Sequence, residues 1–206
     1  MERDAKILSA IAAGILMVAI GLIAFSNHQG TVGAAAALDD GGRVSIKPLP
    51  DGPVAAGKLA ADFKLAGLDG RTISLSSLHG KVVFLNVWAT WCAPCREEMP
   101  SIETLYEEFS RDKDFVVLAV SQDTEGRNAV APYMERNGFK FTVLLDPENQ
   151  VGDAYDVSGI PETFIIDRAG RIVAHHIGPY DWANPEMREA LRELIDNREK
   201  QTAKAE

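Results

Sequence analysis

A long apolar run, a cysteine pair and a helical pattern follow one another without interruption, and this succession constrains the fold more than any other feature. Residues 81–87 read KVVFLNV, with the length and β-branched content of a strand buried on both faces of a sheet. Residues 93–109 repeat apolar side chains at helical spacing. Cys92 and Cys95, the chain's only cysteines, therefore lie where a central strand meets the start of a helix.

The segments around this junction predict a small mixed sheet covered by helices. Two hairpins are expected, at residues 63–75 and 163–176, because short strand-like runs flank turn sequences there. A strand, a helix ended by Gly138 and a short strand are predicted at residues 115–121, 129–137 and 141–145. With a last amphipathic helix at residues 185–200, the pattern indicates an α/β domain with helices on both faces of the sheet.

The N-terminal segment predicts a membrane anchor. Residues 7–25 are nineteen positions without a charge, and a helix of that length spans roughly 28 Å, close to the hydrocarbon thickness of a bilayer. Arg3 and Lys6 precede the run and no Lys or Arg follows until Arg43, so residues 1–6 are expected in the cytoplasm. One alternative is a cleaved signal peptide, although its apolar run is usually about 7–15 residues long, and another is a buried helix of a soluble domain.

Composition divides the remainder into a linker, one domain and a tail. Residues 26–57 are rich in Gly, Ala, Pro and Asp without any period, which predicts a flexible linker. Residues 58–200 form the predicted domain and residues 201–206 a short tail. The formal charge of −9 argues against nucleic-acid binding, which needs clustered Lys and Arg to neutralise phosphates.

The cysteine pair predicts redox chemistry. A Cys at a helix N-terminus lies near unpaired N–H groups and the positive end of the helix dipole, which favour the thiolate. Cys92 is the expected nucleophile, and Cys95, one turn further along, is expected to resolve the mixed disulfide. Pro94 falls in the first helical turn, where its missing N–H costs little. We therefore expect a redox-active Cys92–Cys95 disulfide and no other cofactor.

Two other interpretations of the cysteine pair remain open. A zinc site needs further ligands, but there is no second cysteine pair, and His175 and His176 lack ligand spacing. These histidines alternate along a predicted strand, so at most one is expected to face inward. A purely structural disulfide would close only a very short loop and constrain the unfolded chain little.

Several longer motifs resemble the TlpA/ResA/CcmG-like thiol–disulfide oxidoreductases of the thioredoxin superfamily. They are VVFLNVWATWCAPCREEMP at residues 82–100, LAGLDGRTISLSSLHGK at 65–81, GIPETFIIDRAGRIV at 159–173 and the TlpA-like GPYDW at 178–182. The resemblance covers residues 61–197 and implies a thioredoxin-like fold with an extra N-terminal β-hairpin, preceded by one transmembrane helix. It implies a single-pass protein of the bacterial inner membrane whose catalytic domain lies in the periplasm, with TlpA as the nearest relative.

The resemblance also carries roles for individual residues. Pro161 matches the family's cis-proline beside the cysteine pair, with Ile160 before it, and an ordinary trans proline is the alternative. Trp91 matches the active-site tryptophan, with core packing as the alternative. Glu98 matches a glutamate near the disulfide, where a carboxylate would accept a thiol proton, while a solvated helix residue is the alternative.

Position 86 departs from thioredoxin. The buried aspartate that thioredoxins carry six residues before the first cysteine is Asn86 here. Asparagine does not titrate, so Glu98 or solvent is the expected route for the proton. Trp88 and Trp182 are expected to pack in the core.

The function that these observations predict is reduction of disulfides in target proteins. The resemblance implies targets such as apocytochrome c or copper-site assembly proteins of cytochrome oxidase, with a membrane thiol transporter of the CcdA/DsbD type as electron donor. One alternative is a disulfide-donating oxidant of the DsbA kind, but residues 122–159 are too few for its inserted helical domain. The other is a Sco-like copper chaperone, although those proteins use Cys-x-x-x-Cys. A peroxidase would show a different cysteine pattern.

Overall fold

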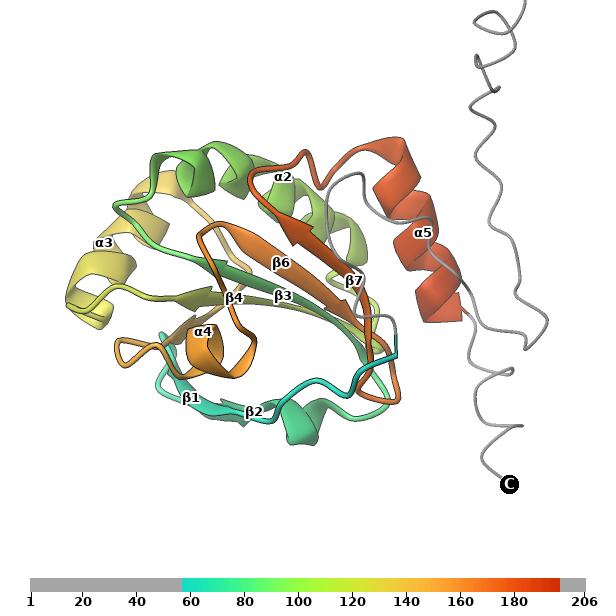
Figure 1. Ribbon diagram of the computed structural model, residues 1–206. Helices are drawn as coiled ribbons and strands as arrows, with labels where there is room; N and C mark the ends of the chain where they lie inside the picture. The colour runs from blue at the N-terminus through green and yellow to red at the C-terminus, as the bar shows by residue number, and fades with distance from the viewer. Residues whose placement is uncertain (1–56, 197–206) are drawn as a thin grey trace, which may run out of the picture. The chain divides into compact units, whose positions relative to one another are not determined.

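The computed structural model describes residues 57–196, where strands and helices alternate around one sheet (Figure 1). The strands are β1 (Lys64–Gly67), β2 (Thr72–Ser74), β3 (Val82–Trp88), β4 (Phe115–Ser121), β5 (Thr142–Leu145), β6 (Glu162–Ile166) and β7 (Ile172–Ile177). The helices are the 3₁₀ helix η1 (Leu75–Leu78), α2 (Ala93–Phe109), α3 (Arg127–Asn137), α4 (Gln150–Ala154) and α5 (Pro185–Asp196).

The seven strands form one mixed sheet in the order β2-β1-β5-β4-β3-β6-β7. The central strand β3 pairs in parallel with β4 and antiparallel with β6, and all seven of its residues are buried. The chain thus builds a β-α-β unit from β3, α2 and β4, and β6 and β7 add an antiparallel hairpin. This topology places the C-terminal end of β3, and the cysteines that follow it, at the middle of one sheet edge.

Each face of the sheet carries its own apolar core. Alternate strand residues such as Phe84 and Ile165 pack with α2, α3 and α5, while their neighbours such as Leu85 and Phe164 pack with η1 and α4. Figure 1 shows the same division, with α2, α3 and α5 on one side of the strands and α4 on the other. The fold is thioredoxin-like α/β with a mixed central sheet flanked by helices, as the sequence predicts.

The segment boundaries agree closely with those expected from periodicity. The predicted limits of α2 and β4 are the observed ones, and Gly138 ends α3 in the left-handed conformation at φ 71°. α3 starts two residues earlier than expected, and Leu75 belongs to η1 because Ser74 caps that turn by accepting from the Ser77 N–H.

One expectation about β7 is wrong. His175 stacks on Phe164 on one face of the sheet, while His176 packs against Tyr180 and Trp182 on the other. Both histidines are covered because helices or loops lie on both faces at this position. The strand alternates as predicted, but each histidine packs against aromatic rings on its own face of the sheet.

The predicted anchor at residues 7–25, nearly all of the linker and the tail lie outside the described residues. Among residues 57–196, no helix combines the length and the apolar character that crossing a bilayer requires.

Candidate active site

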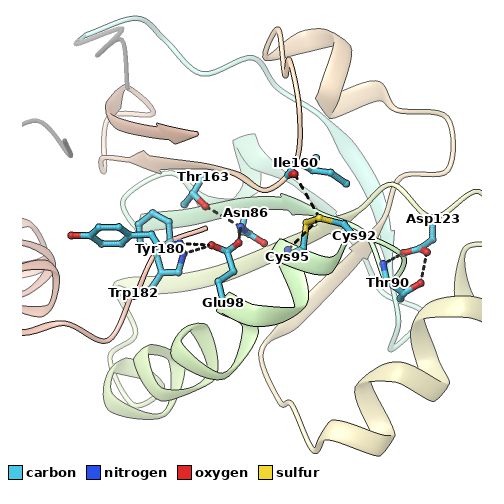
Figure 2. Close-up of a disulfide and its surroundings, with 10 residues drawn as sticks. All are labelled: Asn86, Thr90, Cys92, Cys95, Glu98, Asp123, Ile160, Thr163, Tyr180 and Trp182. Carbon is cyan, nitrogen blue, oxygen red and sulfur yellow. Dashed lines mark hydrogen bonds between the residues drawn. A yellow bond between two sulfur atoms is a disulfide. The ribbon is translucent and has the colours of Figure 1, made fainter. Parts of the chain in front are cut away.

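Cys92 and Cys95 form a disulfide at the start of α2 (Figure 2). Cys92 is the N-cap residue of the helix, and its Sγ accepts a hydrogen bond of 3.2 Å from the Cys95 N–H. Pro94 lies in the first turn, where no intrahelical partner for its nitrogen is needed. The same N–H and the helix dipole would favour negative charge on Cys92 once the disulfide is reduced.

The two cysteines differ in their exposure to solvent. Cys95 is completely buried, whereas Cys92 retains 6% exposure at the protein surface. Trp91, the residue before it, is 67% exposed, so core packing is excluded as the role of this side chain. Cys92 is therefore the more exposed of the two cysteines, with a large exposed aromatic residue directly before it in the chain.

The loop before β6 lies against the disulfide. The Ile160–Pro161 peptide bond is cis, and the Ile160 carbonyl oxygen lies 3.6 Å from Cys92 Sγ. β6 begins at the next residue and pairs with β3, which precedes the cysteines. The sheet thus brings together two segments that are about seventy residues apart in sequence.

Glu98 is a buried carboxylate one turn after Cys95, not a solvated helix residue. Its side chain is 3% exposed and accepts three hydrogen bonds. The donors are Asn86 Nδ2 at 2.9 Å, Trp182 Nε1 at 2.9 Å and the Tyr180 backbone N–H at 3.2 Å. Figure 2 shows the Asn86, Glu98 and Trp182 side chains pointing toward one another.

Burial determines the protonation of this carboxylate. Desolvation raises the pKa of Glu98 from 4.5 to about 7, although the bonds from Trp182, Asn86 and Tyr180 favour the ionised form and oppose that rise. A group with a pKa near 7 exchanges a proton readily at neutral pH, which general acid–base catalysis requires. Glu98 lies on the same helix as Cys95 and three residues after it, which places them on adjacent turns.

Two partners of Glu98 were not expected from the sequence. From the sequence, Asn86 implies only the loss of an acid, yet its amide donates to both Glu98 and Thr163 Oγ1, the latter 2.9 Å away on β6. Trp182 was expected only to pack, and it does so while also donating to the carboxylate. The available signal was the GPYDW motif itself, since the indole N–H of a buried tryptophan usually has an acceptor.

A second buried acid holds the loop that precedes Cys92. Asp123 accepts hydrogen bonds from the Thr90 N–H at 2.9 Å, Thr90 Oγ1 at 2.6 Å and Ser121 Oγ at 2.8 Å. It lies just after the end of β4, which is the strand beside β3. No local sequence pattern predicts this contact, because thirty-three positions separate Asp123 from Thr90.

A third buried acid follows the cis-proline. Glu162 lies 2.5 Å from His175 Nε2 on the neighbouring strand and accepts a bond of 3.1 Å from the Ser158 N–H. Glu162 therefore holds the loop that contains Ile160 and Pro161 against β7.

Within residues 57–196, no group of three or more His, Cys, Asp or Glu side chains is arranged to hold a metal ion.

The sequence is similar to a protein family and to several named relatives. A model described as the AhpC/TSA family matches residues 56–175. The thiol–disulfide oxidoreductase ResA of Bacillus subtilis is 42% identical over 120 residues, which are 58% of this chain and 66% of that protein. ResA of Bacillus cereus is 33% identical over 164 residues, or 80% of this chain and 84% of the relative.

Solved structures of other proteins share the fold of this chain. A thiol:disulfide interchange protein of the thioredoxin family from Chlorobium tepidum is 29% identical and superposes with a TM-score of 0.56, covering 68% of this chain and 98% of the other. StoA from Bacillus subtilis superposes with a TM-score of 0.55 at 24% identity over 67% of this chain and 98% of its own, which supports the fold alone. A narrower likeness to TlpA stays a prediction.

Proposed function

Because this chain belongs to the AhpC/TSA family, we propose that it catalyses thiol–disulfide exchange through Cys92 and Cys95. The observation that supports this most directly is the position of the disulfide. The more exposed cysteine caps a helix N-terminus, and the completely buried cysteine lies one turn behind it. The ResA relatives are named thiol–disulfide oxidoreductases.

The first step uses the thiolate of reduced Cys92. This sulfur attacks one sulfur of a target disulfide, so a mixed disulfide forms and the other target sulfur leaves as a thiolate that takes up a proton. The Cys95 N–H and the helix dipole stabilise the attacking thiolate. The Ile160 carbonyl, beside Cys92, offers an acceptor for a backbone N–H of an extended target segment.

The second step releases the target. Cys95 loses its proton and attacks Cys92 Sγ, which forms the Cys92–Cys95 disulfide and frees the second target sulfur as a thiolate that takes up a proton. The target gains two electrons and the enzyme loses two. Glu98 is the proposed acceptor of the Cys95 proton, because it is a buried acid on the next turn of α2.

We assign the protein mainly the role of a reductant, tethered to the bacterial inner membrane with its domain in the periplasm. The support for the tether is the uncharged run at residues 7–25 with Arg3 and Lys6 before it. Protein disulfides, such as those of apocytochrome c or of copper-site assembly proteins, are the proposed substrates. A membrane thiol transporter of the CcdA/DsbD type would return the electrons.

The test is a redox equilibrium of the full-length chain in glutathione or dithiothreitol buffers, followed by tryptophan fluorescence. Trp91 precedes Cys92 and is exposed, so its emission should report the state of the disulfide. We expect a reversible two-electron couple below roughly −200 mV, lost in Cys92→Ser. A strongly oxidising potential would identify a disulfide donor. Stoichiometric copper binding without a reversible couple would contradict the proposal altogether.

A further inference from the structure

The loop after β7 is attached to α2 at the turn that carries Glu98. Ser101 Oγ donates to the Glu98 carbonyl at 2.7 Å and accepts from the Trp182 N–H at 3.1 Å. The Tyr180 N–H and the Trp182 indole both donate to Glu98 Oε2. Three of these hydrogen bonds connect two segments that are about eighty residues apart in sequence.

Packing fixes the direction of the Trp182 indole. The side chain is completely buried, and its ring meets Phe84 edge-on at a centroid distance of 4.9 Å. His176 and Tyr180 contact the same ring at 5.6 and 5.0 Å. A ring held on three sides keeps its N–H aimed at one point, which is Glu98 Oε2.

We propose that Trp182 is a positioning residue for thiol–disulfide exchange, whose indole N–H holds the Glu98 carboxylate in place to accept the Cys95 proton. This inference rests on the proposed function. A donor to a carboxylate stabilises the ionised form more than the neutral acid, so Trp182 keeps Glu98 able to take up a proton at a lower pH than burial alone would allow. Glu98 also lines a groove of about 380 Å³ together with Glu97, Tyr180 and Asp181.

The groups around Glu98 define what else can influence its titration. Its own helix contributes Cys95 and, at the groove, Glu97. β7 contributes His176 through its contact with Trp182, and the loop contributes Tyr180 and Asp181. Asn86 and Thr163, from β3 and β6, do not titrate. The experiment must therefore distinguish the titration of Glu98 from that of His176.

The first test uses the wild-type full-length chain in its oxidised form. The indole ¹H–¹⁵N signal of Trp182 is followed with pH, together with the carboxyl ¹³C signal of Glu98. We expect the two signals to share one midpoint, and we expect Glu98→Gln to abolish the transition of the indole signal. A Trp182 signal that still titrates in Glu98→Gln would be following His176 and would overturn the inference.

The second test removes the donor. Trp182→Phe keeps an aromatic ring in the core but deletes the N–H. The titration midpoint of the Glu98 carboxyl should then rise by about 1 pH unit or more, because the free energy of a hydrogen bond to a charged group corresponds to a shift of at least that size. The pH dependence of mixed-disulfide resolution should move upward with it. The matched control is Trp88→Phe, because Trp88 is equally buried and its indole nitrogen has no partner among the described residues.

The outcomes separate the two proposals. The carboxyl titration needs no exchange activity, so an unchanged Glu98 midpoint in folded Trp182→Phe overturns the role of Trp182 alone. The redox equilibrium of the wild type decides the proposed function independently. If Trp182→Phe does not fold, the wild-type titration and Glu98→Gln still decide the inference.

Discussion

Asn86 on β3 donates a hydrogen bond of 2.9 Å to Glu98 on α2, and both side chains are buried. Asn86 occupies the position at which thioredoxins carry a buried aspartate. The buried carboxylate therefore belongs to a helix residue instead of a strand residue, and the strand residue donates a hydrogen bond to it. The interior beside the disulfide keeps an acid, although the acid comes from another element of the fold.

This acid should make stability depend on pH. The folded oxidised protein retains the Glu98 proton up to about pH 7, whereas an unfolded chain loses it near the ordinary value of 4.5. The folded state thus binds more protons between these values, so the free energy of unfolding falls as pH rises through that window. We expect wild type to lose up to about 3 kcal/mol relative to Glu98→Gln.

Denaturant unfolding at pH 4.5 and pH 8 measures this difference. Glu97→Gln is the matched control, because Glu97 is the adjacent helix residue and is exposed. Its pH dependence should follow that of the wild type. If Glu98→Gln also followed the wild type, Glu98 would have an ordinary pKa in the folded protein.

The contact between Thr90 and Asp123 should hold the loop that presents Cys92. Thr90→Val preserves the shape of the side chain but removes the hydroxyl bond of 2.6 Å to the buried carboxylate. We expect a loss of about 1–3 kcal/mol in the free energy of unfolding and a several-fold slower attack of Cys92 on a model disulfide. Thr104→Val, which removes an exposed hydroxyl bond to the Pro100 carbonyl, should change neither quantity appreciably. Equal effects of the two variants would refute the specific role of Thr90.

Glu162 should hold the cis-proline loop through two different donors. Glu162→Ala leaves the Ser158 N–H and His175 Nε2 without this acceptor, and we expect a loss of about 3 kcal/mol in unfolding free energy. Glu162→Gln keeps an acceptor oxygen and should lose less. Exposed Glu148→Ala is the control and should change stability by less than about 0.5 kcal/mol. Urea unfolding of the three variants at pH 7 measures these losses in unfolding free energy. An equal loss in Glu162→Ala and Glu148→Ala would contradict the role of Glu162.

Local patterns predicted most of the fold because they depend on neighbours in sequence. The limits of α2 follow from helical periodicity between Cys92 and the residues after Phe109, and those of β4 from an uninterrupted apolar run. Cys92, Cys95 and Pro161 were identifiable from spacing and motif. The packing of both His175 and His176 was not, because it depends on what covers each face of the sheet.

The sequence by itself determined that a buried strand leads into a helix with two cysteines at its start, and that a carboxylate lies one turn further along. The tertiary structure decided that this carboxylate is buried and hydrogen-bonded and that its pKa is raised. Its donors come from β3 and from the loop after β7, and its burial comes from packing between α2 and the sheet. Hydrogen bonds and desolvation act through space, so the pKa of Glu98 depends on residues that no local pattern connects to it.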